Sequence, residues 1–197
     1  MKPTAGILLL TALLLAAPTA WAKTYLSRAQ AQKICFPKAG HFEWKAQRYT
    51  PAQAAALKRA SGHKVIDPGI WYAVAYKDKN KKDVLGVLVF DRAWGKHELI
   101  DYVIALSPEG KVRQIEILVY RENWGDEIRR AGWRKQFVDK HSKSKLTLHR
   151  GIHNIGGATI SCRNVTDGVR RTCHAWHLVV RPALVAAGRL PKLAANE

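Results

Sequence analysis

The chain has 197 residues, of which 33 are Lys or Arg and 15 are Asp or Glu, giving a formal net charge of +18. This length suits one domain with an ordinary hydrophobic core, and after the first 22 residues no segment reaches the run of about 18 apolar residues that a membrane helix needs. The basic residues are dispersed along the chain, which argues against nucleic acid as a partner and favours acidic partners, anionic surfaces or phosphorylated ligands.

The first 22 residues have the pattern of a secretory signal peptide. Lys2 gives a positive start, Ile7 to Ala17 is apolar, and Ala20-Trp21-Ala22 resembles a cleavage site. We therefore expect a mature chain of residues 23–197 that is exported to the periplasm. Cleavage removes only the charge of Lys2 and leaves 32 basic and 15 acidic residues, a net charge of +17.

Two capping boxes predict two short helices near the start of the mature chain. Ser27-Arg28-Ala29-Gln30 opens a helix that stops before Pro37. Thr50-Pro51-Ala52-Gln53 opens a second helix, with proline at its first position and Gly62 as its C-terminal cap. We interpret both helices as structural.

Runs of apolar and alternating residues predict an antiparallel sheet. A polar segment, Asp78 to Asp83, separates two of these runs, and Ser107-Pro108-Glu109-Gly110 forms a turn between two others. The fold class is therefore α+β, with an antiparallel β-meander packed against helices in one domain. The predicted strands are His41–Tyr49, Ile70–Tyr76, Val84–Arg92, Leu99–Leu106 and Lys111–Tyr120.

Helical patterns dominate the rest of the chain. A helix is expected through Trp133, Phe137 and Val138, and a basic connector follows at 141–150. Apolar residues then recur at helical spacing from Ser161 to Arg181, and we expect Pro182 to kink or end that helix.

The cysteines and histidines give weak signals. Cys162 and Cys173 would lie about 16 Å apart on one helix, so any disulfide would have to use Cys35. Cys173-His174-x-x-His177 offers two possible metal ligands on one helix face, but no third ligand is evident elsewhere. We assign neither a metal site nor a catalytic residue.

The most informative stretch is the turn that precedes the long C-terminal helix. Gly156 and Gly157 allow close approach of the backbone, Ala158 is small, and Thr159 presents a hydroxyl. Ser161 is a plausible N-cap, which would place Thr159 one turn ahead of the helix. Backbone N–H groups at a helix start attract phosphate, so this turn suits a phosphorylated cofactor.

Gly157-Ala158-Thr159-Ile160-Ser161 resembles the S-G-A-T-x-S/T signature of the FMN-binding domain in Rnf-type and sodium-pumping NADH:quinone oxidoreductase subunits. The resemblance implies that Thr159 carries FMN through a phosphoester bond, with Gly156, Gly157, Ala158 and Ser161 around it. It extends over about Tyr25 to Val180.

A second motif, Arg121-Glu122-x-x-Gly125-x-Glu127-Ile128, also resembles this family, in which an E-x-x-G element after the sheet lines the flavin site. The resemblance therefore implies that Glu122 and Gly125 contact the flavin. The purely structural alternatives are an exposed charge at a strand end for Glu122 and a turn glycine for Gly125.

Two positions depart from the family pattern. Gly156 replaces the usual serine, and His153 replaces the usual aspartate six residues before the threonine. Both positions bear on recognition by the flavin transferase that attaches FMN.

The resemblance implies a periplasmic electron-transfer flavoprotein that works with a membrane-bound redox protein. No G-x-G-x-x-G fingerprint follows a strand, which argues against direct use of a nicotinamide donor. The alternative is a cofactor-free basic protein of the periplasm that binds an anionic surface or an assembly partner.

Overall fold

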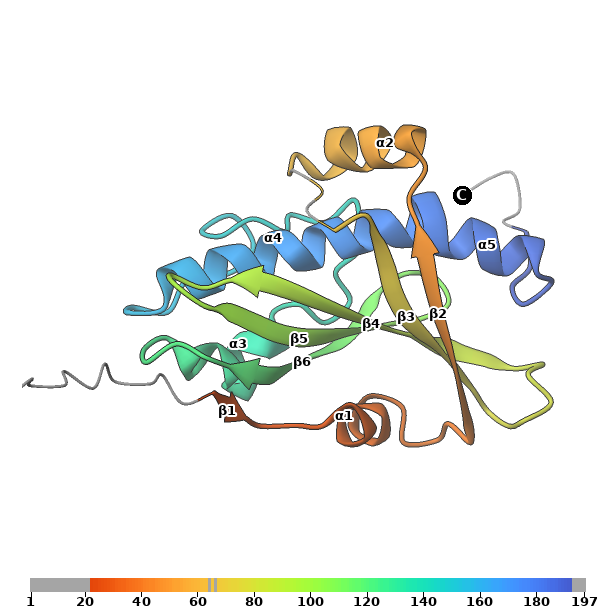
Figure 1. Ribbon diagram of the computed structural model, residues 1–197, viewed down its shortest axis with the longest axis horizontal. Helices are drawn as coiled ribbons and strands as arrows, with labels where there is room; N and C mark the ends of the chain where they lie inside the picture. Colours follow the sequence, from red (N-terminus) through yellow and green to blue (C-terminus); the bar gives the residue numbers. More distant parts are fainter. Residues whose placement is uncertain (1–21, 64, 66, 193–197) are drawn as a thin grey trace, which may run out of the picture.

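The computed structural model describes residues 22–63, 65 and 67–192. The predicted signal peptide, apart from Ala22, lies outside these residues. The described chain forms a six-stranded antiparallel sheet in the order β1-β6-β5-β4-β3-β2 (Figure 1). The predicted α+β fold and meander are confirmed, and β1 is an addition that the sequence analysis missed. The strands are β1 (Lys23–Thr24), β2 (His41–Arg48), β3 (Gly69–Tyr76), β4 (Val84–Trp94), β5 (Leu99–Leu106) and β6 (Val112–Tyr120).

Both predicted capping boxes are present. Ser27 and Thr50 each accept a hydrogen bond from the backbone of the glutamine three residues later, and Gly62 ends the second helix with φ +74°. The helices are α1 (Arg28–Cys35), α2 (Pro51–Ser61), the 3₁₀ helix η1 (Asp126–Arg129), α3 (Ala131–Lys135), α4 (Thr159–Ala175), the π-helical turn η2 (Trp176–Val180) and α5 (Arg181–Ala186).

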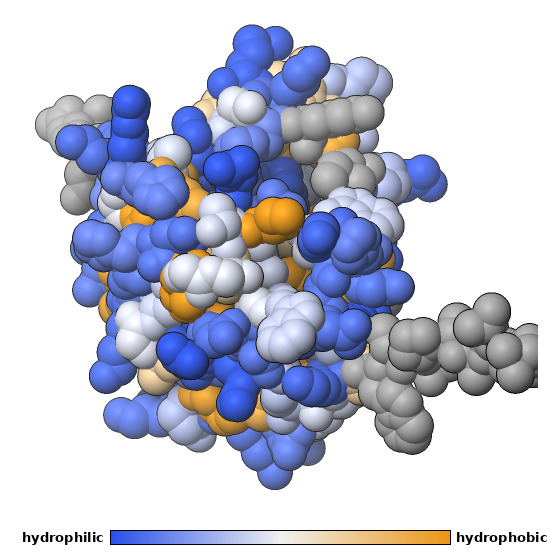
Figure 2. All heavy atoms as spheres, turned by 90° about the vertical axis from the view of Figure 1, so that its left-hand side faces the viewer, coloured by the Kyte–Doolittle hydropathy of each residue, from blue (hydrophilic) through white to orange (hydrophobic). Residues whose placement is uncertain are grey.

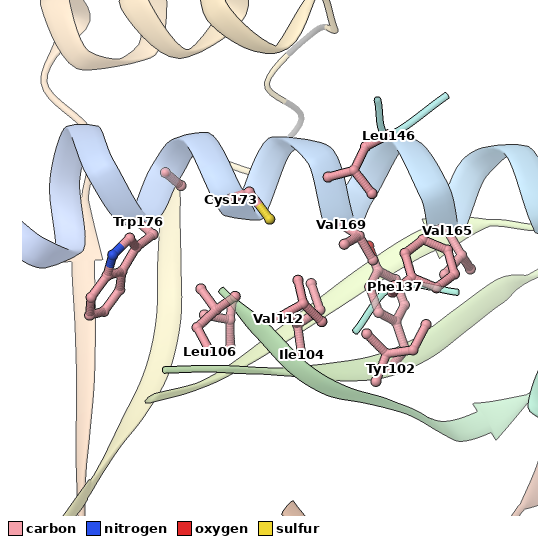
Figure 3. Packing of buried hydrophobic residues seen from close by; sticks show 14 of the residues in the cluster. Tyr102, Ile104, Leu106, Val112, Phe137, Leu146, Val165, Val169, Cys173 and Trp176 are labelled. Carbon is pink, nitrogen blue, oxygen red and sulfur yellow. The ribbon is translucent and has the colours of Figure 1, made fainter. Parts of the chain in front are cut away.

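Helix α4 covers one face of the sheet, and α1 packs on the opposite face (Figure 1). Figure 3 shows the core beneath α4, where apolar side chains of the helix point at those of the strands. Full burial of an aliphatic side chain stabilises a fold by about 1.5–3 kcal/mol, so this layer anchors α4 firmly. The labelled contributors include Val165, Val169 and Cys173 from α4, Trp176 from η2, and Tyr102, Ile104, Leu106 and Val112 from the sheet.

Two boundaries of the helices at the C-terminal side differ from the prediction, namely the end of α3 and the start of α4. Helix α3 ends at Lys135, so Phe137 and Val138 lie in the turns that follow it. Helix α4 begins before Ser161, and the helical path continues through Pro182 into α5. Pro182 lies in the first turn of α5, where its missing N–H is tolerated, and η2 precedes it with a bond from Arg181 N–H to Trp176 O.

All three cysteines are buried and unpaired. Cys162 and Cys173 both lie on α4, as expected. Among the described residues, no helix combines the length and the apolar character that a membrane span requires.

Candidate functional site

The glycine turn places Thr159 as the first residue of α4. Gly157 has φ +83°, a left-handed value that suits glycine, and Ala158 follows as the N-cap residue. The prediction that Ser161 caps the helix is wrong, and Thr159 does not stand one turn ahead of it. Helix α4 begins two residues earlier than expected, so Ser161 is buried within its first turn.

The start of α4 offers free backbone donors beside open space. The first helical bond joins Cys162 N–H to Ala158 O at 2.8 Å, and Ala158 supplies no side-chain cap. The N–H groups of the three residues between them therefore lack an acceptor within the helix. A Cβ placed on Gly156 or Gly157 would meet no atom within 4 Å, so the space beside these two glycines is open.

Asn154 orients the hydroxyl of Thr159. The Asn154 side-chain amide donates a hydrogen bond of 2.8 Å to Thr159 Oγ1. The carbonyl oxygen of the same side chain is buried and has no hydrogen-bond partner. Buried polar atoms are seldom left unpaired, so this oxygen is available to a donor on a ligand.

Ser161 and Gly125 lie side by side, so the structure joins the two sequence motifs. A Cβ on Gly125, which has φ +96°, would lie 2.6 Å from Tyr120 Oη and 3.2 Å from Ser161 Oγ. The Tyr120 hydroxyl donates to Trp124 O at 2.6 Å and lies 3.0 Å from Ser161 Oγ, which therefore donates to it. Burial raises the pKa of Tyr120, so its hydroxyl keeps the proton that holds the loop.

Glu122 stabilises the turn between β4 and β5. Its Oε1 accepts hydrogen bonds from the backbone N–H groups of His97 at 2.5 Å and Glu98 at 2.9 Å. A Cβ on Gly95 would collide with this carboxylate, so the turn closes tightly around it. The contact of Glu122 with the flavin stays a prediction, and the contact with the turn was not foreseen.

Two exposed tryptophans belong to the same end of the molecule, and neither was predicted as a site residue from the sequence. The Trp94 and Trp124 side chains are 53% and 86% exposed. Their backbone oxygens accept hydrogen bonds of 2.6 Å from Asn164 of α4 and from Tyr120, respectively. Figure 2 faces this end, where apolar patches are scattered among hydrophilic residues. The sequence signal that could have found them is the position of both tryptophans at the edges of turns, where a large apolar side chain is not needed for core packing.

Helix α3 fixes the segment that leads to the turn. Trp133 Nε1 donates to His153 O at 2.9 Å, and His153 N–H donates to Gln136 Oε1 at 2.7 Å. The His153 side chain itself is exposed. Helix α3 therefore holds the backbone before Asn154. The side chain of His153, which replaces the usual aspartate of the family, faces solvent.

These residues fit a phosphorylated ligand such as FMN. The uncapped start of α4 suits a phosphate, because its N–H groups and the helix dipole both favour an anion. The unpaired Asn154 carbonyl oxygen suits a hydroxyl donor, and FMN has such hydroxyls on its ribityl chain. The open space over the two glycines leaves room for that chain.

Residues 95–174 match the sequence model of a family described as FMN-binding domain. This range runs from the β4–β5 turn into α4 and contains all seven predicted site residues. The crystal structure of Shewanella oneidensis NqrC has a similar fold, with a TM-score of 0.53 and 13% identity over 82% of this chain and 91% of that one. A search of curated proteins found no match. The family resemblance is thus confirmed over residues 95–174, which match the FMN-binding domain family, and this match points to FMN as the cofactor.

Proposed function

We propose that the mature chain is a periplasmic flavoprotein that carries FMN on Thr159 and relays electrons with a membrane-bound redox protein. The observation that carries the proposal is the position of Thr159. Thr159 is the first residue of α4. Its hydroxyl accepts a hydrogen bond from Asn154 and lies next to the glycine turn, where space is open. When bound, FMN supplies the one- and two-electron redox chemistry, and the protein controls its orientation and access.

Attachment requires a reaction at Thr159 Oγ1. A bond forms between this oxygen and the flavin phosphorus, the bond from that phosphorus to the leaving group of a phosphate-activated flavin breaks, and the hydroxyl proton is released. We propose that a flavin transferase catalyses this exchange. Asn154 holds the oxygen in place, and the free N–H groups of α4 stabilise the negative phosphate.

The remaining site residues keep the turn rigid. Tyr120 and Ser161 join β6 to α4, and Gly125 lets the backbone pass close to both hydroxyls. Glu122 closes the β4–β5 turn beside this loop. Rigid residues around the flavin lower the cost of orienting its ring for electron transfer.

The location and the partner rest on the sequence. The signal-peptide pattern supports export, and the net charge of +17 on residues 23–197 favours docking to an acidic redox protein. The FMN-binding domain match disfavours the alternative of a cofactor-free binding protein.

Co-expression of the full chain with a flavin transferase tests the proposal. We expect to recover the protein from the periplasm. Its intact mass should equal that of residues 23–197 with one FMN attached, and its visible spectrum should be that of a flavin. Purified protein that neither contains FMN nor binds added FMN would contradict the carrier function. FMN-loaded protein that still contains Met1 would contradict the location alone.

A further inference from the structure

The sheet splits between β3 and β4. The two strands pair only as far as Trp71 and Phe90, although β3 starts at Gly69 and β4 runs on to Trp94. Figure 1 shows β3 turning away from β4 toward α2. A cavity of about 1090 Å³ lies at this split, and none of the seven predicted FMN-site residues lines it.

An aromatic wall borders the cavity on the face that α1 only partly covers. The rings of Trp44 and Phe90 lie 5.0 Å apart and those of Trp44 and Trp71 lie 6.5 Å apart, measured between centroids. Trp71 is 55% exposed and Trp44 is 43% exposed, and Trp71 and Phe90 line the cavity directly. Large indole surfaces left in water are characteristic of a binding surface for another flat or apolar group.

Two unmatched positive charges stand beside this wall. The guanidinium carbon of Arg28 lies 5.7 Å from the Trp71 ring centroid and 5.9 Å from that of Phe90. Arg28 and Arg48 both line the cavity, and within the described residues neither forms an ion pair. The other arginines of the lining are matched by carboxylates: Arg92 by Asp67, Arg121 by Asp101 and Arg171 by Asp91.

We propose that this cavity binds a planar aromatic anion, a fused ring system that carries a sulfonate, carboxylate or phosphate group. The ring stacks on Trp71 and Phe90, and the anionic group pairs with Arg28 and Arg48. Ligand pockets in proteins commonly have this composition, with aromatic walls and a few converging charged groups. The cavity shares no lining residue with the predicted FMN site, and the proposal does not rest on attachment at Thr159.

Equilibrium dialysis of the mature protein against anthraquinone-2-sulfonate, read by absorbance, tests the proposal. We expect saturable binding of one equivalent. Trp71→Ala should weaken it about tenfold by removing the stacking surface. Arg28→Gln should weaken it about fivefold and reduce its dependence on salt. Both side chains are exposed, so the variants should keep the wild-type circular dichroism.

Matched controls distinguish binding at this cavity from nonspecific attraction to positive charge and from binding at the FMN turn. Lys33→Gln removes one exposed positive charge from the same helix and should leave binding unchanged. Thr159→Ala should also leave it unchanged. The proposal is overturned if no saturable binding occurs, if either cavity variant binds like wild type, or if Lys33→Gln or Thr159→Ala weakens binding as much as Trp71→Ala does.

Discussion

The side-chain amide of Asn154 donates a hydrogen bond of 2.8 Å to Oγ1 of Thr159, the first residue of α4. The bond links the connector before the glycine turn to the helix after it. Since Trp133 and Gln136 fix the backbone of the neighbouring His153, the orientation of the Thr159 hydroxyl depends on α3 as well as on α4.

We therefore expect Asn154→Ala to slow FMN attachment about tenfold, because a lost hydrogen bond of about 1.4 kcal/mol corresponds to that factor. The rate would be followed by in-gel flavin fluorescence during incubation with a flavin transferase. Asn164→Ala is the matched control, since it also removes an amide hydrogen bond at α4, to Trp94 O, but leaves Thr159 untouched. Equal rates for the two variants would show that Asn154 does not orient the hydroxyl.

Gly125→Ala should destabilise the domain by about 2–3 kcal/mol. The residue has φ +96°, and its new Cβ would press on Tyr120 Oη at 2.6 Å, breaking the junction with Ser161. Urea unfolding followed by circular dichroism measures the loss. Gly132→Ala in α3 is the control, because its Cβ meets no atom within 4 Å, and it should be neutral or slightly stabilising. A similar loss in both variants would refute the tight contact at Gly125.

The domain should lose stability as the pH falls from about 7 to 5. Burial, followed by the nearby charge of Arg170, lowers the pKa of His174, and burial with Arg181 lowers the pKa of His177. The unfolded chain therefore takes up protons at the usual histidine pKa of about 6.5, whereas the folded chain resists them, so acid favours unfolding.

Replacement of both histidines isolates their part of this pH dependence. We expect the double variant His174→Gln/His177→Gln to lose less stability between pH 7 and 5 than the wild type in urea titrations. A pH slope identical to that of wild type would mean that other groups cause the acid loss.

The sheet and the first two helices could be predicted because their signals are local. Alternation and turn residues set the strands to within a few positions, and Ser27 and Thr50 form the capping boxes that their sequences predict. The start of α4 could not be predicted in the same way. Ser161 is a favourable N-cap type, but its hydroxyl bonds to Tyr120, which is 41 residues away in the sequence.

The candidate site shows the same limit. The motif located the turn that holds Thr159, but the contact of Gly125 with Ser161 was not predicted from the sequence. Asn154 and Tyr120 position these residues through hydrogen bonds. Neither residue belongs to a recognisable motif, so the sequence did not indicate them. The split of β3 from β4 was not predicted either, because strand pairing involves residues that are distant in the sequence.

Loss of the covalent flavin from Thr159→Ala tests the central claim most directly. Wild type, Thr159→Ala and Thr159→Ser would be co-expressed with a flavin transferase, exported, denatured and examined by peptide mass and in-gel fluorescence. We expect FMN on the peptide containing residue 159 in wild type, retention in Thr159→Ser, which keeps a hydroxyl, and complete loss in a folded Thr159→Ala. Covalent flavin that persists in Thr159→Ala would contradict attachment at this residue.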